Sequence, residues 1–203
     1  MVDPPIINDR FPVEFRPRPV NDTPWTLEGH EWMDMGEYFK EVPEFDDPRQ
    51  GNIGDCSLIS SLTSIVWTRP YAIRNDARVS EYGDETSPIH EFTFFENGKP
   101  VHVEVSEKVL VWITGTNPQW HFARSNDAGE VWPAVIEKAY AKWYTRSETD
   151  CPCLKNIERQ FPKDVCRWLI GGKATSKRHA NISSDELFDF VKDNCYGKKA
   201  QNP

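Results

Sequence analysis

The feature that most constrains this chain is a glycine-bracketed turn that leads directly into an apolar-faced segment. The turn is Gln50-Gly51-Asn52-Ile53-Gly54-Asp55, and Cys56 follows it. Glycine adopts backbone conformations that other residues resist, and aspartate is favoured just before the first turn of a helix. Apolar residues then recur at helical spacing, at Leu58, Ile59, Leu62, Ile65 and Val66. We therefore expect a helix that begins near Cys56 and ends before Pro70, because the residue before a proline disfavours helical geometry.

A cysteine in the first turn of a helix is suited to nucleophilic chemistry. The unpaired N–H groups and the helix dipole at that end favour the thiolate over the thiol. The thiolate is the form that attacks carbonyl carbon atoms. A lone cysteine beside an apolar helix is also commonly a small buried hydrophobic residue. The position of Cys56 leaves both interpretations open, so the flanking residues must decide between them.

The stretch around Cys56 resembles the active-site segment of the calpains, papain-like cysteine endopeptidases whose pattern is Gln-Gly-x-Leu-Gly-Asp-Cys-Trp-Leu-Leu. The resemblance implies that Cys56 is the catalytic nucleophile and that Gln50 helps to form the oxyanion hole. A side-chain amide is a suitable donor to a developing oxyanion. The sequence departs from the pattern at Ser57, where the family has tryptophan. We expect different packing around the thiol as a result.

A second segment, residues 129–142, also resembles the calpains. Its run Glu137-Lys-Ala-Tyr-Ala-Lys142 matches the family segment letter for letter. Independently of that resemblance, apolar residues recur along it at helical spacing, and proline is tolerated in a first helical turn. The pattern predicts a long core helix with one buried face, formed by Trp132, Val135, Ile136, Ala139, Tyr140 and Trp143.

The resemblance further implies a calcium ion in this lobe. In the family it is held by backbone carbonyls, by an aspartate nine residues before the cysteine and by the glutamate that precedes the second segment. These residues are Asp47 and Glu130 here. Carboxylate and carbonyl oxygens suit a hard cation. The alternatives are a solvated loop acid for Asp47 and a favourable acid at a helix N-terminus for Glu130.

Several further elements follow from local patterns. Alternating segments at 91–96 and 101–105 flank Asn97-Gly98, which predicts an antiparallel hairpin. A short strand is expected at 109–113 within an otherwise loop-like stretch from 106 to 128, and residues 25–49 are expected to form a short helix or turns. A helix from 163 to 170 should stop at Gly171-Gly172, and Ser183 with Glu186 forms a capping box that opens a last helix.

The histidines give weaker signals. His90 and His102 lie on or beside the hairpin strands, where we expect solvated polar positions rather than a catalytic base. His179 and Asn181 make a local pair, but residues so close in sequence do not easily act as base and orienting group. The family places its histidine and asparagine in Gly-His-Ala-Tyr-like and Asn-Pro-Trp-Gly settings of a second lobe, and neither pattern occurs in this sequence.

The expected fold class is α+β: a papain-like cysteine protease fold, with a mainly helical nucleophile lobe and a small antiparallel sheet. We predict a proline-rich N-terminal extension over residues 1–39. Residues 40–203 are predicted to form the first lobe of a calpain-like protease core, with the second lobe absent. Such a lobe would carry the nucleophile and be incomplete as an enzyme by itself.

Charge and composition exclude several function classes. The net charge is −8 and no basic run is long enough to follow a phosphate backbone, so we expect neither nucleic acid nor anionic membranes as partners. No apolar run approaches the roughly 20 residues of a membrane span, and no signal pattern opens the chain. Five cysteines, an odd number, disfavour a complete disulfide framework. Pro152 and wide gaps also disfavour a zinc site built from Cys151, Cys153, Cys166 and Cys195. A cytoplasmic protein is expected.

Three functions are consistent with these observations. The first is a calpain-like, calcium-dependent cysteine endopeptidase that acts on protein substrates or with a complementing protease lobe. The second is a catalytically inactive calpain-like pseudoprotease that serves as a protein-binding or regulatory module. The third is a structural α+β module that keeps the motifs for packing. Ser57 and the missing histidine favour the second function over a lone enzyme, whereas intact Gln50, Asp55 and Cys56 favour descent from an active protease.

Overall fold

The structure is a computed structural model of the chain, and it describes residues 23–70, 72–73, 78–80, 88–173, 177 and 179–193. The chain divides into two compact units, one up to Gly172 and one from Lys173 onward. Most of the proline-rich segment and Cys195 lie outside the described residues. No helix in the described ranges is both long enough and apolar enough to cross a bilayer.

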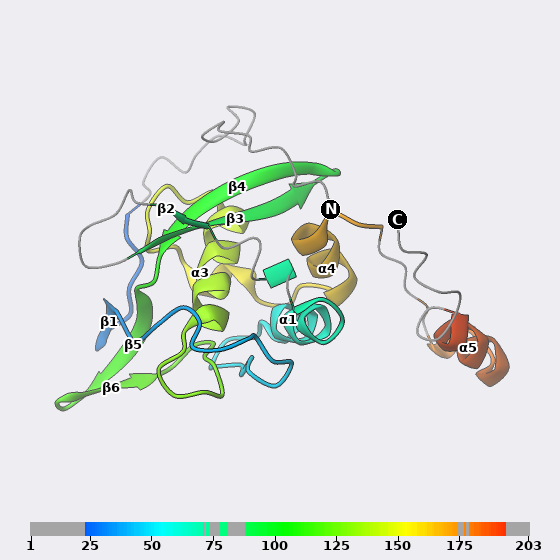
Figure 1. Cartoon of the computed structure of the whole chain (residues 1–203), viewed down its shortest axis with the longest axis horizontal. Helices are drawn as coiled ribbons and strands as arrows, with labels where there is room; N and C mark the ends of the chain where they lie inside the picture. The colour runs from blue at the N-terminus through cyan, green and yellow to red at the C-terminus, as the bar shows by residue number, and fades with distance from the viewer. Residues whose placement is uncertain are drawn as a thin grey trace. The chain divides into compact units, whose positions relative to one another are not determined.

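Among the described residues, the first unit contains two small antiparallel sheets and the α-helices α1, α3 and α4 (Figure 1). One sheet has the order β1-β5-β6, formed by His30–Met33, Val109–Thr114 and Asn117–Trp120. The other has the order β2-β3-β4, formed by Arg78–Ser80, Ile89–Glu96 and Lys99–Ser106. The helices are α1 (Cys56–Thr68), α3 (Trp132–Thr145) and α4 (Pro162–Ile170), with the 3-10 helix η1 (Leu154–Ile157) between α3 and α4.

The α1 helix has the bounds that the apolar spacing predicts. It begins at Cys56, ends at Thr68, and buries the predicted apolar face against the rest of the unit. The α4 helix ends at Ile170 and is capped by Gly171, whose φ of 68° is a left-handed conformation that suits glycine. In the second unit, α5 (Ser184–Val191) begins with the predicted capping box, in which Glu186 N donates to Ser183 Oγ and Ser183 N donates to Glu186 Oε2.

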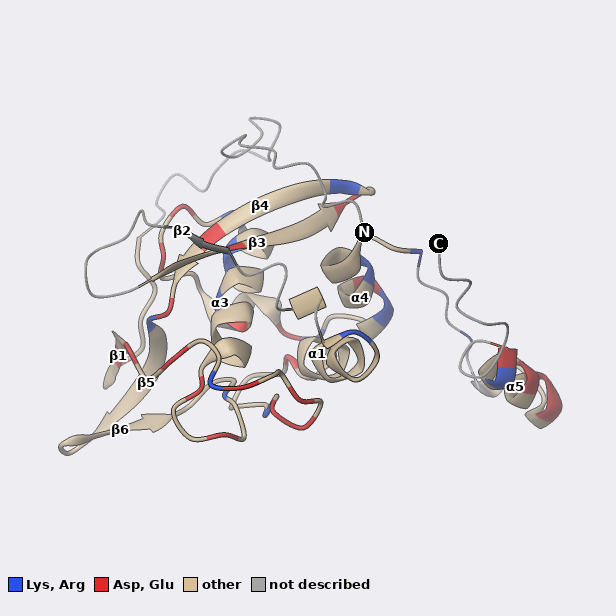
Figure 2. Cartoon of the chain, in the orientation of Figure 1, with Lys and Arg blue, Asp and Glu red and all other residues tan. Residues whose placement is uncertain are grey.

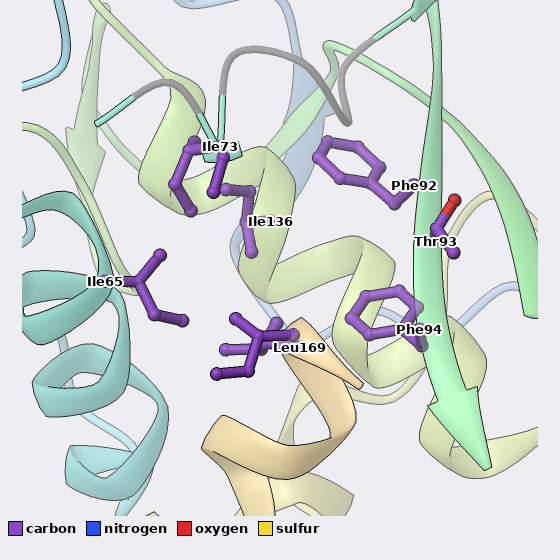
Figure 3. Close-up of a pocket in the computed structure, with 9 residues that line it drawn as sticks. Ile65, Ile73, Phe92, Thr93, Phe94, Ile136 and Leu169 are labelled. Atoms are coloured by element: carbon purple, nitrogen blue, oxygen red, sulfur yellow. The ribbon is translucent and has the colours of Figure 1, made fainter. Parts of the chain in front are cut away.

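The predicted hairpin is confirmed as β3 and β4. Asn97 and Gly98 have φ values of 50° and 79°, as a two-residue turn between twisted strands requires. Phe92 and Phe94 alternate with more exposed residues along β3 and are buried. They face α3, which contacts both β3 and β4 (Figure 3).

The α3 helix is the centre of the core. We predicted one buried face, but every residue from Trp132 to Trp143 is buried. Even Lys138 is enclosed, with its Nζ donating to Ser106 Oγ, Lys108 O and Asp150 Oδ2 at 3.0, 2.7 and 2.9 Å. Burial lowers the pKa of Lys138 to about 8, against the opposing effect of Asp150. Burial all round follows because α3 contacts α1, η1 and strands of both sheets.

Two strands and one histidine differ from expectation. Residues 30–33, expected within a short helix or turns, form β1, which pairs with β5 at His30↔Trp112. Residues 117–120, expected in a loop, form β6 and pair with the other side of β5. His90 was expected in solvent but is buried, with Nε2 2.6 Å from Glu107 Oε1 and its ring 4.2 Å from that of Tyr38.

An apolar cavity of about 30 Å³ lies between α1, β3 and α4 (Figure 3). Ile65, Ile136, Leu169 and the aromatic rings of Phe92 and Phe94 point into it. Its volume is that of about one water molecule, and its lining offers few polar partners for one. The cavity is therefore a packing feature of the core and not a polar binding site.

Candidate active site

The turn before Cys56 docks on the segment that follows β6. Arg49 and Arg124 exchange backbone hydrogen bonds of 2.9 and 3.1 Å, and Asn52 N donates to His121 O at 2.8 Å. A Cβ atom on Gly51 would lie 2.3 Å from the carbonyl carbon of Phe122, well inside contact distance. Glycine at position 51 is thus required by the close approach of two backbones, and this contact fixes where the turn can lie.

Cys56 is the first residue of α1 and is exposed. Its neighbours Asp55, Ser57 and Leu58 are buried. The amide groups of Leu58 and Ile59 donate to Asp55 O at 2.7 and 3.2 Å, so Asp55 starts the helix through its backbone. The thiol of Cys56 therefore does not belong to the hydrophobic core.

Asp55 occupies the N-cap position, but its side chain makes no capping hydrogen bond. The carboxyl group is instead buried against Glu137 of α3. Burial raises the pKa of Asp55 to about 6. Burial, followed by the neighbouring Asp55 charge, also raises the pKa of Glu137 well above its ordinary value. The residue before the cysteine thus belongs to a buried pair of acids rather than to a capping motif.

The side-chain amide of Gln50 is held within its own turn. Gln50 Nε2 donates to Ile53 O at 2.6 Å. A primary amide carries two N–H donors, so this bond leaves the group one further donor. The oxyanion-hole role of Gln50 stays a prediction.

Ser57, which stands where the related pattern has tryptophan, joins α1 to the chain entering α4. Its Oγ donates to Gln160 O. Ser61, one turn later, donates to Ser57 O at 2.6 Å and approaches Pro162 O at 3.3 Å. The small side chain at position 57 therefore replaces the volume of an indole with a hydrogen bond between segments.

A second contact holds the same turn from the other direction. Gly54 N donates to Glu158 Oε1 at 3.2 Å, and Arg159 N donates to Gly54 O at 2.9 Å. The residues immediately before Cys56 are consequently held by the 158–160 segment as well as by the 121–124 segment.

Asp47 and Glu130, the two predicted metal ligands, come together and are joined by Asp127. Ligand oxygens of the three residues all lie within 4.8 Å of one another. Asp47 Oδ2 accepts from Glu44 N at 2.7 Å and from Trp132 Nε1 at 3.2 Å. Glu130 accepts from Ser125 Oγ at 2.8 Å and from Lys40 N at 3.2 Å. We call Asp47, Asp127 and Glu130 the acid cluster.

The electrostatics of the acid cluster suit a hard cation. Burial raises the pKa of both Asp47 and Glu130, and Asp127 adds to each shift. A hydrogen bond to Asp127 raises the pKa of exposed Glu41 as well. Figure 2 shows further acidic residues along the loops that lead into α1 and α3. Oxygen ligands with excess negative charge fit calcium better than zinc or copper.

Sequence reasoning missed Asp127. The signal available was its place three residues before Glu130 in the same loop, but acidic loop residues are common and carry no metal-specific pattern. The backbone explains the grouping, because Asn126 N donates to Asp47 O at 2.8 Å and Glu37 pairs with Glu130 in an isolated bridge.

The histidines with described side chains have partners of their own. His30 Nε2 lies 2.6 Å from His121 Nδ1, and His102 Nδ1 lies 3.1 Å from Thr93 Oγ1. Burial, then the charges of His30 and Lys155, lower the pKa of His121. His179 lies in η2 (His179–Asn181) of the second unit.

The cysteines offer no metal site in the described ranges. Cys56, Cys151, Cys153 and Cys166 are free thiols. Among the residues that the structure describes, the acid cluster is the one group of three or more potential ligands close enough to hold an ion.

Comparison with known proteins adds a family to this geometry. Residues 14–195 match the family model described as calpain family cysteine protease. Calpain-A of Drosophila melanogaster is 27% identical over 130 residues, which cover 64% of this chain and 15% of the relative. A thiol protease of Porphyromonas gingivalis is 28% identical over 173 residues, covering 78% and 35%. The calpain-2 catalytic subunit of Gallus gallus is 32% identical over 93 residues, covering 46% and 13%. The chain thus spans from 13% to 35% of the length of these relatives.

Proposed function

The chain belongs to the calpain family of cysteine proteases, and from this membership we propose that it is the nucleophile-bearing lobe of a calpain-like cysteine endopeptidase with a papain-like fold. The observation that carries the proposal is the position of Cys56. Cys56 is exposed and is the first residue of α1. The turn before it is held in place by hydrogen bonds to two other segments. The proposed substrates are proteins, and the proposed partner is a complementing protease lobe.

The chemistry proposed for this lobe is the first half of acyl transfer. A histidine that the complementing lobe supplies takes the proton of the Cys56 thiol, and Sγ forms a bond to the carbonyl carbon of a peptide while the carbonyl oxygen takes up the displaced electron pair. The free N–H of Gln50 donates to that oxygen. The carbonyl then re-forms as the C–N bond breaks, and the leaving amine takes the same proton back from the histidine. Water hydrolyses the resulting thioester and regenerates the thiol.

We further propose that the acid cluster holds a calcium ion. The ion would supply the positive charge that the three carboxylates lack. Asp47, Asp127 and Glu130 would ligate it, and Asp47 also accepts a hydrogen bond from Trp132 at the start of α3. Asp47 is two residues from Arg49, which pairs with Arg124 beside the nucleophile turn. Fixing Asp47 thus restrains the chain that leads to Cys56.

A peptidase assay tests the proposed function. The full chain is incubated with a fluorogenic calpain peptide and calcium, alone and with a separately expressed second lobe of a calpain relative. We expect the complemented parent chain to cleave the peptide and the Cys56→Ala variant to lose this cleavage. The control is Cys166→Ala, which removes another free, partly exposed thiol and should still cleave the peptide. Equal cleavage by the parent and Cys56→Ala would show that Cys56 is not the nucleophile.

A non-catalytic protein-binding module is the second candidate function. The observation that favours it is the engagement of His30, His90, His102 and His121 with partners other than Cys56. If the complemented chain does not cleave the peptide but a biotinylated peptidyl inhibitor of calpains still binds reversibly, the binding role is supported.

We propose the cytoplasm as the location of the protein. The described thiols are free, and a reducing compartment keeps thiols in that state.

A further inference from the structure

Asp55 and Glu137 form a buried pair of acids next to the nucleophile. Each side chain belongs to a residue that is 1% exposed. Ala123 N donates to Glu137 Oε2 at 3.1 Å. The other three oxygens, Asp55 Oδ1, Asp55 Oδ2 and Glu137 Oε1, have no hydrogen-bond donor among the described residues. No ion pair in the described ranges brings a cation to either carboxyl group.

Two ionised carboxylates in contact, without a cation and away from water, strongly disfavour each other. A single proton between them removes one charge and supplies a donor to oxygens that otherwise have none. We propose that Asp55 and Glu137 share one proton and that this carboxyl pair positions Cys56. The positioning role rests on the proposed function, in which Cys56 is the nucleophile.

The contacts of the pair show how it would position Cys56. Asp55 is bonded covalently to Cys56, and its carbonyl oxygen accepts from Leu58 N and Ile59 N. Glu137 belongs to α3, which is buried on all sides. A proton-linked pair therefore fastens the first turn of α1 to the most rigidly enclosed helix of the unit. Loss of the proton would set two like charges against each other and release Asp55 from α3.

The surroundings favour the protonated pair. Glu158, whose Oε1 accepts from Gly54 N, adds another negative charge near Asp55. Other titratable or charged residues on the segments packed around the pair include Cys56 on α1, Lys138 on α3, His121 and Arg124 beside Ala123, Arg49 paired with Arg124, Lys155 in η1, and Arg159, whose N–H donates to Gly54 O. Lys138 is directed to Asp150 and His121 to His30, so neither neutralises the pair.

Infrared spectra of the parent and of each variant, compared as difference spectra, test whether a proton is shared. The parent should show the C=O band of a protonated, buried carboxylic acid at neutral pH. Both Asp55→Asn and Glu137→Gln should lack it, because an amide then supplies the donor and the remaining acid ionises. Glu158→Gln, which changes the acid that contacts Gly54 from the 158–160 segment, should retain the band. Absence of the band from the parent would overturn the proposal.

The reactivity of Cys56 tests the positioning role. Labelling by a peptidyl electrophile is followed across the pH range, with Cys166 in the same molecule as an internal control. In the parent, Cys56 labelling should fall by about a hundredfold on the alkaline side, where the shared proton is lost, although an ordinary thiol becomes faster there. Asp55→Asn and Glu137→Gln keep a hydrogen-bonded pair without a titrating proton, so their labelling should not fall.

The outcomes separate this proposal from the proposed function. The same alkaline fall in both amide variants would overturn the positioning role. If Cys56 of the parent reacts no faster than Cys166 at any pH, the proposed function is wrong and the positioning role fails with it, whereas the infrared band still decides whether a proton is shared. Circular dichroism of each variant checks folding. Asparagine and glutamine are used at positions 55 and 137 because they keep the size of the side chain.

Discussion

At the scale of single residues, the turn before Cys56 depends on small side chains at two positions and on a buried acid at a third. Gly51 allows two backbones to meet, Ser57 donates a hydrogen bond to Gln160 O, and Asp55 is buried beside Glu137. Cys56 is exposed among these buried neighbours. The reactive position is therefore built by its neighbours, each of which can be tested by one substitution.

Gly51→Ala should destabilise the chain, because the new Cβ atom would overlap the backbone of Phe122. Overpacking of this kind costs about 1–3 kcal/mol. The measurement is the free energy of unfolding in urea. Gly54→Ala is the matched control, since its Cβ atom would meet Glu158 at 3.7 Å, an ordinary contact. Equal losses in both variants would contradict the steric explanation.

Calcium should raise the melting temperature of the full chain, and the rise should be larger at pH 7.5 than at pH 5, where protons compete more strongly for the ligands. The sign follows from the raised pKa values of Asp47 and Glu130, which keep protons on the ligands as the pH falls. Differential scanning fluorimetry measures the shift. Glu130→Gln and Asp127→Asn should abolish it, whereas Asp46→Asn, an exposed neighbour, should not. A shift that survives both ligand variants would place the ion elsewhere.

At the scale of elements, α1 is fixed by contacts at its first turn more than by its caps. Ser57 joins it to the entry of α4, and the 121–124 segment supports the turn before it. The α3 helix receives contacts from both sheets and has almost no exposed surface before Tyr144. The helix that begins at Cys56 is thus held by segments that are distant in sequence.

Ser57→Ala should cost about 1 kcal/mol, because Gln160 O loses the hydroxyl that donates to it. Ser57→Trp, which introduces the residue of the family pattern, should cost more, since position 57 is buried against the 160–162 segment. Urea unfolding measures both losses. Ser64→Ala, on the exposed side of the same helix, is the control. If Ser57→Trp is as stable as the parent, the space between position 57 and the 160–162 segment can accommodate an indole ring.

The partial burial of His121, together with its contact with His30 of β1, should make the chain less stable in acid. The pKa of His121 is lowered in the folded state, so the unfolded chain binds more protons once the pH falls below the ordinary value near 6.5. This contribution to the free energy of unfolding is present above that pH and is lost as the pH falls. His121→Gln should flatten the dependence between about pH 7.5 and pH 5, while His102→Gln should leave it. An unchanged slope in His121→Gln would exclude this contact as the cause.

The elements that sequence reasoning predicted are those specified by local chemistry. Asn97-Gly98 requires a tight hairpin, Gly171 ends α4, and Ser183 caps α5 through its own hydroxyl. β1 and β6 were missed because each is a strand only through pairing with β5, and no short pattern encodes a distant partner. His90 was missed for the same reason, since Tyr38 and Glu107 bury it from outside its strand.

The candidate site divides along the same line. The motifs gave Gln50, Cys56, Asp47 and Glu130, and the structure adds that Asp47 and Glu130 meet. Asp127 and the pairing of Asp55 with Glu137 depend on contacts across 80 or so residues, which one sequence does not reveal. The motifs in the sequence thus identify single candidate residues, whereas the structure is needed to show which acidic side chains lie together.

At the scale of the whole molecule, the chain matches only part of each relative, and the first unit exposes large apolar side chains near the proposed site. Phe161 is 71% exposed and directly follows Gln160, the residue that accepts from Ser57. An exposed aromatic residue at this place is suited to contact with another protein surface. We expect the complementing lobe to cover it.

Phe161→Ser should therefore weaken association with the second lobe by about tenfold, which corresponds to about 1.4 kcal/mol, and leave the stability of the chain by itself unchanged. We expect the stability of the Phe161→Ser variant to be unchanged because Phe161 supports α4 through its backbone carbonyl, which accepts from Asp164 N and Val165 N. Isothermal titration calorimetry measures the association. Val42→Ser removes another exposed apolar side chain as a control. Equal weakening by both would indicate nonspecific apolar contact.

The enclosure of α3 has a mechanical consequence. Trp132 Nε1 donates to Asp47 of the acid cluster, and Glu137 meets Asp55, which precedes the nucleophile. These two positions are five residues apart on one helix, about 7.5 Å along its axis. Because α3 is buried from Trp132 to Trp143, we expect a displacement at the acid cluster to reach the turn before Cys56 through this one helix, without an intervening loop.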